Sequence, residues 1–147
     1  EVFPDARLVW AHRDPYKATA SLGNLWKLAK SIVLHPDAID PKAMGANAKA
    51  QMAAHVQRPL QIRDRIGDDQ FFDMYYHEMM ADPLDVMHRL YKWAGDDLSP
   101  DVEARMRAWL SDHPQTRYGL NSYHLDQYGL TVEELQPVFA AYLAAFD

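Results

Sequence analysis

Arg13 and Ser21 are the residues of this chain whose types and spacing best fit a chemical role. An apolar run ends at His12, and Arg13 stands directly before Asp14 and Pro15, where a helix is expected to begin. A guanidinium can hold phosphate oxygens through two parallel hydrogen bonds. Ser21 lies about two helical turns after Asp14, so its hydroxyl is expected on the same face and near the same anion. The spacing indicates an anion site, although pairing of Arg13 with a carboxylate and packing of Ser21 would explain the same residues.

Two short strands and two long helices are expected to position this pair. Residues 8–11 form an apolar run typical of a buried strand, and the aromatic run "FFDMYY" at 71–76 predicts a second one. A helix is predicted from Pro15 to about His35, with its apolar face at Ala18, Leu22, Leu25, Ala29 and Ile32. Residues 43–66 predict another helix, which Pro59 should kink or break.

Three further helices are indicated by their start signals. Asp82-Pro83 and Ser99-Pro100 each combine a capping side chain with a proline at the first helical position. Thr131 and Glu134 have the spacing of a capping box. The last helix is expected to bury an apolar set formed by Leu135, Val138, Phe139, Tyr142 and Leu143.

The order of the elements predicts an α/β fold with a parallel sheet and many helices. Two strands joined by a long helical crossover favour parallel pairing, and ligands of such sheets bind beyond the carboxyl ends of the strands. Arg13 lies at that end of the first strand. Two strands alone make a sheet of marginal stability. We therefore expect that part of the natural protein precedes Glu1 and supplies further strands.

Composition narrows the class of protein. The chain has 147 residues, 24% of them charged, and a formal net charge of −6, which disfavours nucleic acid as a partner. No apolar run is long enough to suggest a membrane span. The absence of cysteine excludes disulfides and thiolate chemistry, and the seven histidines lack the spacing of metal ligands. We expect a cytoplasmic protein without a metal.

The segment "FPDARLVWAHRDPYKATASLGNLW" resembles the 3′-phosphate-binding segment of sulfotransferases that use 3′-phosphoadenosine 5′-phosphosulfate, especially a bacterial branch with an H-R-D-P signature. The family pattern is a strand, an Arg and a Ser eight positions later, and Arg13 and Ser21 match it. The resemblance implies that both residues hold the 3′-phosphate of this co-substrate. His12 and Lys17 lie beside them, and either a phosphate contact or a structural role would account for each.

A second segment, "MYYHEMMADPLDVMHRLYKWAG", is similar to the family stretch in which a strand tyrosine lies against the adenine, and Tyr76 occupies that position. His77-Glu78 replaces the usual Glu-Asp pair. "LSPDVEARMRAWLSDHP" and "YHLDQYGLTVEELQPVFAAY" resemble the C-terminal region of the family. The resemblance makes Arg117 a candidate for a late basic contact to the phosphate. The tyrosines at 118, 123 and 128 could line an acceptor pocket or pack the last helix.

The resemblance also implies what should lie outside the sequence. The 5′-phosphosulfate loop and the catalytic base of the family precede the Arg–Ser segment, so the catalytic residue is expected upstream of Glu1. Residues 1–147 would then be the C-terminal part of one sulfotransferase domain with a P-loop-NTPase-like fold. The chain alone should be inactive, and a homodimer or pairing with the N-terminal part would complete it.

Two functions of different classes follow. The first is transfer of a sulfuryl group to a hydroxyl or amine of a small molecule, glycan or peptide. The alternative is a nucleotide-binding or interaction module that lost its catalytic half. A kinase-like P-loop protein is disfavoured because no GxxxxGKS or GxxxxGKT motif occurs.

Overall fold

The computed structural model describes residues 3–114 and 122–146, and the chain divides into two compact units. The first unit comprises residues 1–12 and 67–121, and the second comprises residues 13–66 and 122–147. The division falls between His12 and Arg13, so the first strand belongs to the first unit, whereas Arg13 and Ser21 belong to the second.

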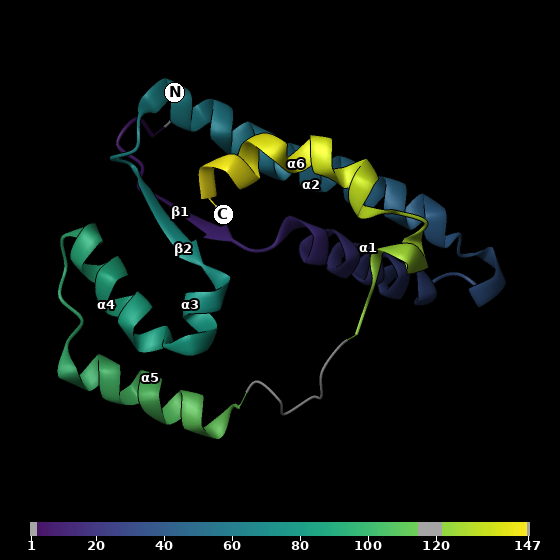
Figure 1. Cartoon of the computed structure of the whole chain (residues 1–147). Coiled ribbons are helices and arrows are strands. Elements are labelled where there is room, and N and C mark those ends of the chain that lie inside the picture. The colour runs from purple at the N-terminus through teal and green to yellow at the C-terminus, as the bar shows by residue number, and fades with distance from the viewer. Residues whose placement is uncertain (1–2, 115–121, 147) are drawn as a thin grey trace. The chain divides into compact units, whose positions relative to one another are not determined.

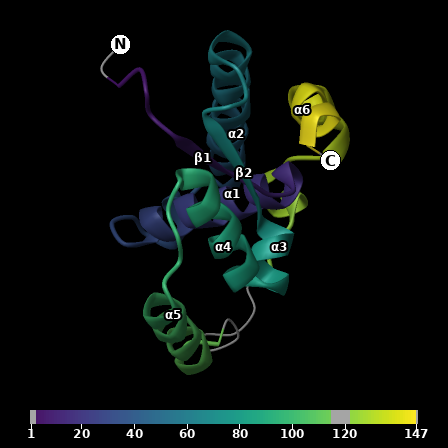
Figure 2. The same cartoon turned by 90° about the vertical axis from the view of Figure 1, so that its left-hand side faces the viewer.

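The first unit contains two parallel strands, β1 (Leu8–His12) and β2 (Phe71–Tyr75), which are neighbours in Figure 2. Leu8 pairs with Phe71 and His12 with Tyr75, which confirms the predicted parallel pairing. The second strand ends one residue earlier than predicted, because the backbone turns into a helix at Tyr76.

Three helices follow the strands of this unit: α3 (Tyr76–Ala81), α4 (Pro83–Ala94) and α5 (Pro100–Asp112). The Asp82 side chain accepts hydrogen bonds from the amides of Leu84 and Asp85 and so caps α4 as predicted. Gly95 ends α4 with a φ of 77°, a left-handed conformation that glycine adopts without steric cost. Ser99 caps α5 through the Val102 amide.

The second unit is helical, with α1 (Pro15–Ser31), α2 (Pro41–Ile66) and α6 (Val132–Phe146), and with short 3₁₀ segments η1 (Pro36–Ala38) and η3 (Leu125–Tyr128). Figure 1 shows α6 beside α2, and the two helices are in contact. Of the two predicted effects of Pro59, a break is excluded, because α2 continues through this residue, and a kink stays a prediction. A proline removes one backbone hydrogen bond, and a helix of 26 residues retains many others.

The Tyr128 side chain fills the space between α1 and α2. A Cβ atom added at Gly23 would lie 3.0 Å from the Tyr128 ring, and one at Gly45 would lie 2.2 Å from the Tyr128 carbonyl oxygen. The hydroxyl of Tyr128 donates a hydrogen bond to Asn24. These contacts assign Tyr128 to packing, and they require glycine at Gly45 because the backbone of η3 approaches it directly.

The predicted buried face of α1 is wrong in part, and this close packing explains why. The buried residues of the helix are Pro15, Thr19, Ala20 and Gly23. By contrast, Leu25 is 60% exposed and Ile32 is 79% exposed. Small side chains face the neighbouring elements because Tyr128 and α2 lie too close for leucine or isoleucine.

The start of α6 follows the predicted capping box. The Glu134 amide donates to the Thr131 hydroxyl at 3.3 Å, and the Thr131 amide donates to the Glu134 carboxylate at 3.1 Å. Leu135, Phe139 and Tyr142 are buried, as expected. Tyr16 of α1 meets Phe139 edge to face, with ring centroids 6.0 Å apart. The beginning of α1 is therefore fixed to the core of this unit.

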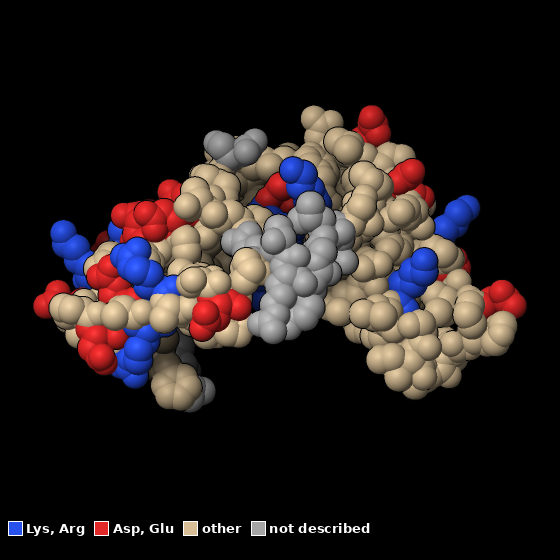
Figure 3. Space-filling model, turned by 90° about the horizontal axis from the view of Figure 1, so that it is seen from below, with Lys and Arg blue, Asp and Glu red and all other residues tan. Residues whose placement is uncertain are grey.

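Charged residues of both signs are interspersed on the face seen in Figure 3. Ion pairs occur in the first unit, where Arg89 contacts Asp85 and Glu78, and Arg107 contacts Glu103. Among the described helices, none has the length and hydropathy required to cross a membrane.

Candidate functional site

Arg13 is the first residue of the second unit and lies two positions before the first residue of α1. The next residue, Asp14, accepts hydrogen bonds from the amides of Tyr16 at 2.9 Å and Lys17 at 3.2 Å. Two backbone donors of this helix end are therefore already bound by a carboxylate, whose charge also opposes an incoming anion. Any anion held here depends mainly on side-chain donors.

Arg13 and Ser21 converge on one oxygen atom, the hydroxyl of Tyr123. Arg13 Nη2 donates to Tyr123 Oη at 3.4 Å. A hydrogen bond with Ser21 is the largest cause that lowers the pKa of Tyr123, followed by the hydrogen bond and the charge of Arg13, and burial opposes them. The guanidinium and the hydroxyl thus both approach Tyr123 Oη, as the spacing of residues 13 and 21 predicts.

This donor set fits a phosphate group. The oxygen between the donors belongs to a neutral phenol, whereas a carboxylate in this place would already have supplied the negative charge. A guanidinium with a neighbouring hydroxyl offers several hydrogen-bond donors, and the terminal oxygens of a phosphate ester are acceptors. The roles of Arg13 and Ser21 as phosphate ligands remain predictions.

His12 lies in the first unit and takes part in an ion pair there. Its ring is only 3% exposed, and Nε2 lies 2.9 Å from Asp73 Oδ1. The imidazole is also 4.7 Å from the Trp10 ring and 5.1 Å from the Tyr75 ring, measured between centroids. These contacts favour the structural interpretation of His12. Lys17 is 76% exposed and lies 3.7 Å from Asp14, which indicates a surface residue.

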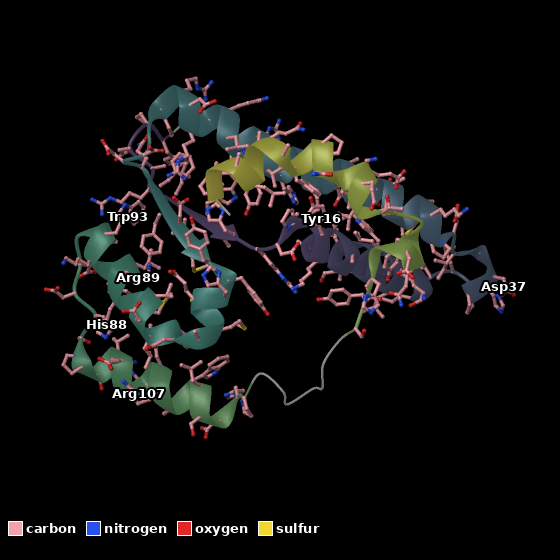
Figure 4. The ribbon with its side chains drawn as sticks, in the orientation of Figure 1. Tyr16, Asp37, His88, Arg89, Trp93 and Arg107 are labelled. Atoms are coloured by element: carbon pink, nitrogen blue, oxygen red, sulfur yellow. The ribbon has the colours of Figure 1, made fainter. Side chains whose placement is uncertain are left out.

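Tyr76 is the first residue of α3 and is 45% exposed. The prediction that it belongs to a strand is wrong, and its contact with adenine remains a prediction. Its neighbour Glu78 pairs with Arg89, which Figure 4 labels on α4, and the hydrogen bond to Glu78 is the largest cause that raises the pKa of Arg89. Arg117 and Tyr118 lie outside the described residues.

Two cavities of similar size differ in their linings. A cavity of about 550 Å³ in the second unit is lined in part by Lys17, Tyr123 and His124. A cavity of about 500 Å³ in the first unit is lined mainly by apolar side chains, among them Met79, Met87 and Trp109, with Arg105 as its charged residue. Across residues 3–114 and 122–146, no three His, Asp or Glu residues are grouped to hold a metal ion.

The contact of Tyr123 with Arg13 is the feature of the site that the sequence did not reveal. Tyr123 is 110 positions from Arg13, and the sequence suggested for it only an acceptor pocket or packing of the last helix. A tyrosine close in sequence to the capped start of α6 has no local signal for contact with α1. Only the packing of η3 between α1 and α2 brings the two segments together.

Comparison with known proteins identifies the family. A model of the sulfotransferase family matches residues 1–100. The omega-hydroxy-beta-dihydromenaquinone-9 sulfotransferases Stf3 of Mycobacterium bovis and Mycobacterium tuberculosis are each 29% identical over 129 residues, which covers 85% of this chain and 31% of theirs. The chain belongs to the sulfotransferase family.

Solved structures agree with this assignment. The sulfotransferase STF9 from Mycobacterium avium is 62% identical, with a TM-score of 0.90, over 99% of this chain and 37% of that one. The sulfotransferase STF1 from Mycobacterium tuberculosis H37Rv is 30% identical, with a TM-score of 0.68, over 94% and 34%. The predicted fold class is confirmed, and the chain spans about a third of the length of these relatives.

Proposed function

We propose that the protein is a sulfotransferase that uses 3′-phosphoadenosine 5′-phosphosulfate, and that this chain holds the 3′-phosphate of the donor. The observation that carries the proposal is the convergence of Arg13 and Ser21 on the Tyr123 hydroxyl. A bound phosphate oxygen would take up the same donors. Membership of the sulfotransferase family supports the choice of this donor over other phosphate esters.

In the proposed reaction, an acceptor oxygen or nitrogen forms a bond to sulfur while the bond from sulfur to the 5′-phosphate oxygen breaks. The leaving group is adenosine 3′,5′-bisphosphate, and the proton of the acceptor passes to a base that we expect outside these residues. Arg13 and Ser21 would act at a distance from the sulfur. Their contribution is to fix the position of the donor so that the acceptor meets it in line.

The acceptor is proposed to be a hydroxyl group of a small molecule. Two relatives, the Stf3 proteins, are omega-hydroxy-beta-dihydromenaquinone-9 sulfotransferases, which supports a hydroxyl over an amine. Tyr76 and Arg117 remain the proposed further contacts to the adenine and the 3′-phosphate. Self-association and pairing with a preceding part of the domain remain predictions as well.

The test is binding of adenosine 3′,5′-bisphosphate to the intact protein by isothermal titration calorimetry. Arg13→Ala is expected to weaken the affinity by about 10-fold or more, because each charge-assisted hydrogen bond contributes about 1.5–3 kcal/mol. Arg105→Ala is the matched control, since this exposed arginine of α5 pairs with Asp101. Equal affinities of the Arg13 variant and the unmodified protein would contradict the assignment.

A transfer assay separates the two function classes. The intact protein, supplied with the phosphosulfate donor and a hydroxylated acceptor, is expected to release adenosine 3′,5′-bisphosphate. Tight binding of the bisphosphate without turnover on any acceptor would instead support the alternative, a nucleotide-binding module.

A further inference from the structure

Tyr123 stands at the centre of the donor cluster formed by Arg13 and Ser21. Its hydroxyl oxygen accepts from Arg13 Nη2 at 3.4 Å, which is long for a hydrogen bond from nitrogen to oxygen. The residue precedes η3, and the packing of Tyr128 against Gly23 and Gly45 fixes that segment on α1 and α2. The phenol is therefore held near the two donors by the core of its own unit.

A phenol hydroxyl can donate one hydrogen bond while its oxygen accepts others. Hydrogen bonds from Ser21 and Arg13 to this oxygen lower the pKa of Tyr123, and a more acidic hydroxyl is a stronger donor to an anion. A terminal phosphate group offers three oxygens with several lone pairs. One guanidinium and one serine hydroxyl leave part of this acceptor capacity for a third donor.

We propose that Tyr123 is a third ligand of the 3′-phosphate, whose hydroxyl donates a hydrogen bond to a phosphate oxygen held between Arg13 and Ser21. This inference rests on the proposed function, because it concerns the same phosphate. It assigns Tyr123 a binding role that neither the spacing of the sequence nor the comparisons indicate.

The geometry favours a Tyr123 that stays in the site and binds the phosphate over a Tyr123 that the phosphate displaces. The contact from Arg13 Nη2 to Tyr123 Oη is long and therefore weak, so the phenol can shift without losing a strong hydrogen bond to Arg13. Only a small displacement of the phenol is then needed for its hydroxyl to turn toward the phosphate. The ring also lines the adjacent cavity of about 550 Å³, which provides the space for this movement.

The experiment compares two nucleotides on the intact protein and its Tyr123→Phe variant by calorimetry. The variant is expected to bind adenosine 3′,5′-bisphosphate about 10-fold more weakly, the loss expected for one hydrogen bond to a charged group. Adenosine 5′-monophosphate lacks the 3′-phosphate, and its affinity is expected to stay within about twofold. Tyr91→Phe on α4 removes a hydroxyl from the other unit and is expected to change neither affinity.

Each other outcome overturns the inference in a distinguishable way. An unchanged affinity of Tyr123→Phe for the bisphosphate would exclude a ligand role, and a tighter affinity would identify Tyr123 as a residue that the phosphate displaces. An equal loss for both nucleotides would show a structural effect on the whole site. If Arg13→Ala weakens the bisphosphate while Tyr123→Phe does not, the proposed function stands and the Tyr123 inference fails. If the unmodified protein binds both nucleotides equally, both proposals fail.

Discussion

The contacts that stabilise each unit internally differ between the two units of the chain. In the second unit, helices approach closely through small residues, and Tyr128 fills the space between Gly23 and Gly45. In the first unit, amphipathic helices with half-buried methionines leave an apolar cavity of about 500 Å³, and ion pairs such as Arg107–Glu103 lie at the surface. Figure 4 shows Arg107 on α5 and Arg89 on α4.

This difference shows where the chain can fix a ligand with precision. Arg13, Ser21 and Tyr123 all belong to the second unit, and each is attached to an element that the Tyr128 contacts position. A side-chain donor that binds a phosphate must be positioned to within a fraction of an ångström. Close backbone packing provides this, whereas exposed ion pairs contribute little to order or stability.

The largest effect is expected for Gly45→Ala. The added Cβ would lie 2.2 Å from the Tyr128 carbonyl oxygen, so the backbone must shift, at a cost of about 3 kcal/mol. We expect this loss in the free energy of unfolding, together with weaker binding of adenosine 3′,5′-bisphosphate, because α2 and η3 must move apart and Tyr123, which precedes η3, is displaced with it. Denaturant unfolding and calorimetry provide the two measurements.

The matched control is Gly67→Ala in the first unit. A Cβ at Gly67 meets no atom within 4 Å, but the φ of 86° makes alanine strained there. The expected cost is about 1–2 kcal/mol, with nucleotide affinity unchanged. If Gly67→Ala destabilised the protein as much as Gly45→Ala, the inference that the second unit depends more on close backbone packing would be wrong.

A smaller effect is expected for Asp73→Asn, which removes the charged partner of buried His12. We expect a loss of about 2 kcal/mol in the free energy of unfolding, the scale of a hydrogen bond to a charged group. Asp85→Asn alters an exposed pair with Arg89 and should cost less than about 1 kcal/mol. Equal losses in urea unfolding would show that the His12 pair stabilises no more than a surface contact.

The smallest effect concerns the titration of two tyrosines of the second unit. Hydrogen bonds from Ser21 and Arg13 lower the pKa of Tyr123, and burial raises the pKa of Tyr128. In ultraviolet titration of tyrosinate, Tyr123→Phe should therefore remove an early component and Tyr128→Phe a late one, relative to the usual value of about 10. The reverse order would contradict the two environments.

The same shifts give opposite contributions to stability at high pH. Tyr123 is more acidic in the folded chain, so its contribution is present above the unfolded pKa and is lost as the pH falls through the folded value. Tyr128 is less acidic when folded, so its contribution is present below the unfolded pKa and is lost as the pH rises through the folded value.

Local signals in the sequence predicted the elements better than their packing. Asp82 and the Thr131–Glu134 box marked helix starts because capping depends on neighbouring residues, and the structure confirms both. The apolar face of α1 was predicted wrongly because Leu25 and Ile32 suggested a wide hydrophobic stripe. The buried face is set by the approach of α2 and η3, which is a tertiary property without a signal in α1 itself.

The candidate site shows the same limit. Ser21 lies on α1 and Arg13 lies two positions before its first residue, so local geometry alone predicts that their side chains reach a common point. Tyr123 comes from a segment 110 positions away, and its approach depends on the glycine contacts of Tyr128. Long-range convergence of this kind cannot be obtained from spacing or propensity.

The exposed apolar side chains at the end of α1 affect how the protein behaves at high concentration. Leu25, Leu28 and Ile32 lie on one side of the helix with most of their surface in water. Water solvates such a stripe poorly, and the tendency of molecules to adhere through it increases with warming and with salting-out anions such as sulfate. Cool, sulfate-free buffers should therefore keep concentrated samples dispersed.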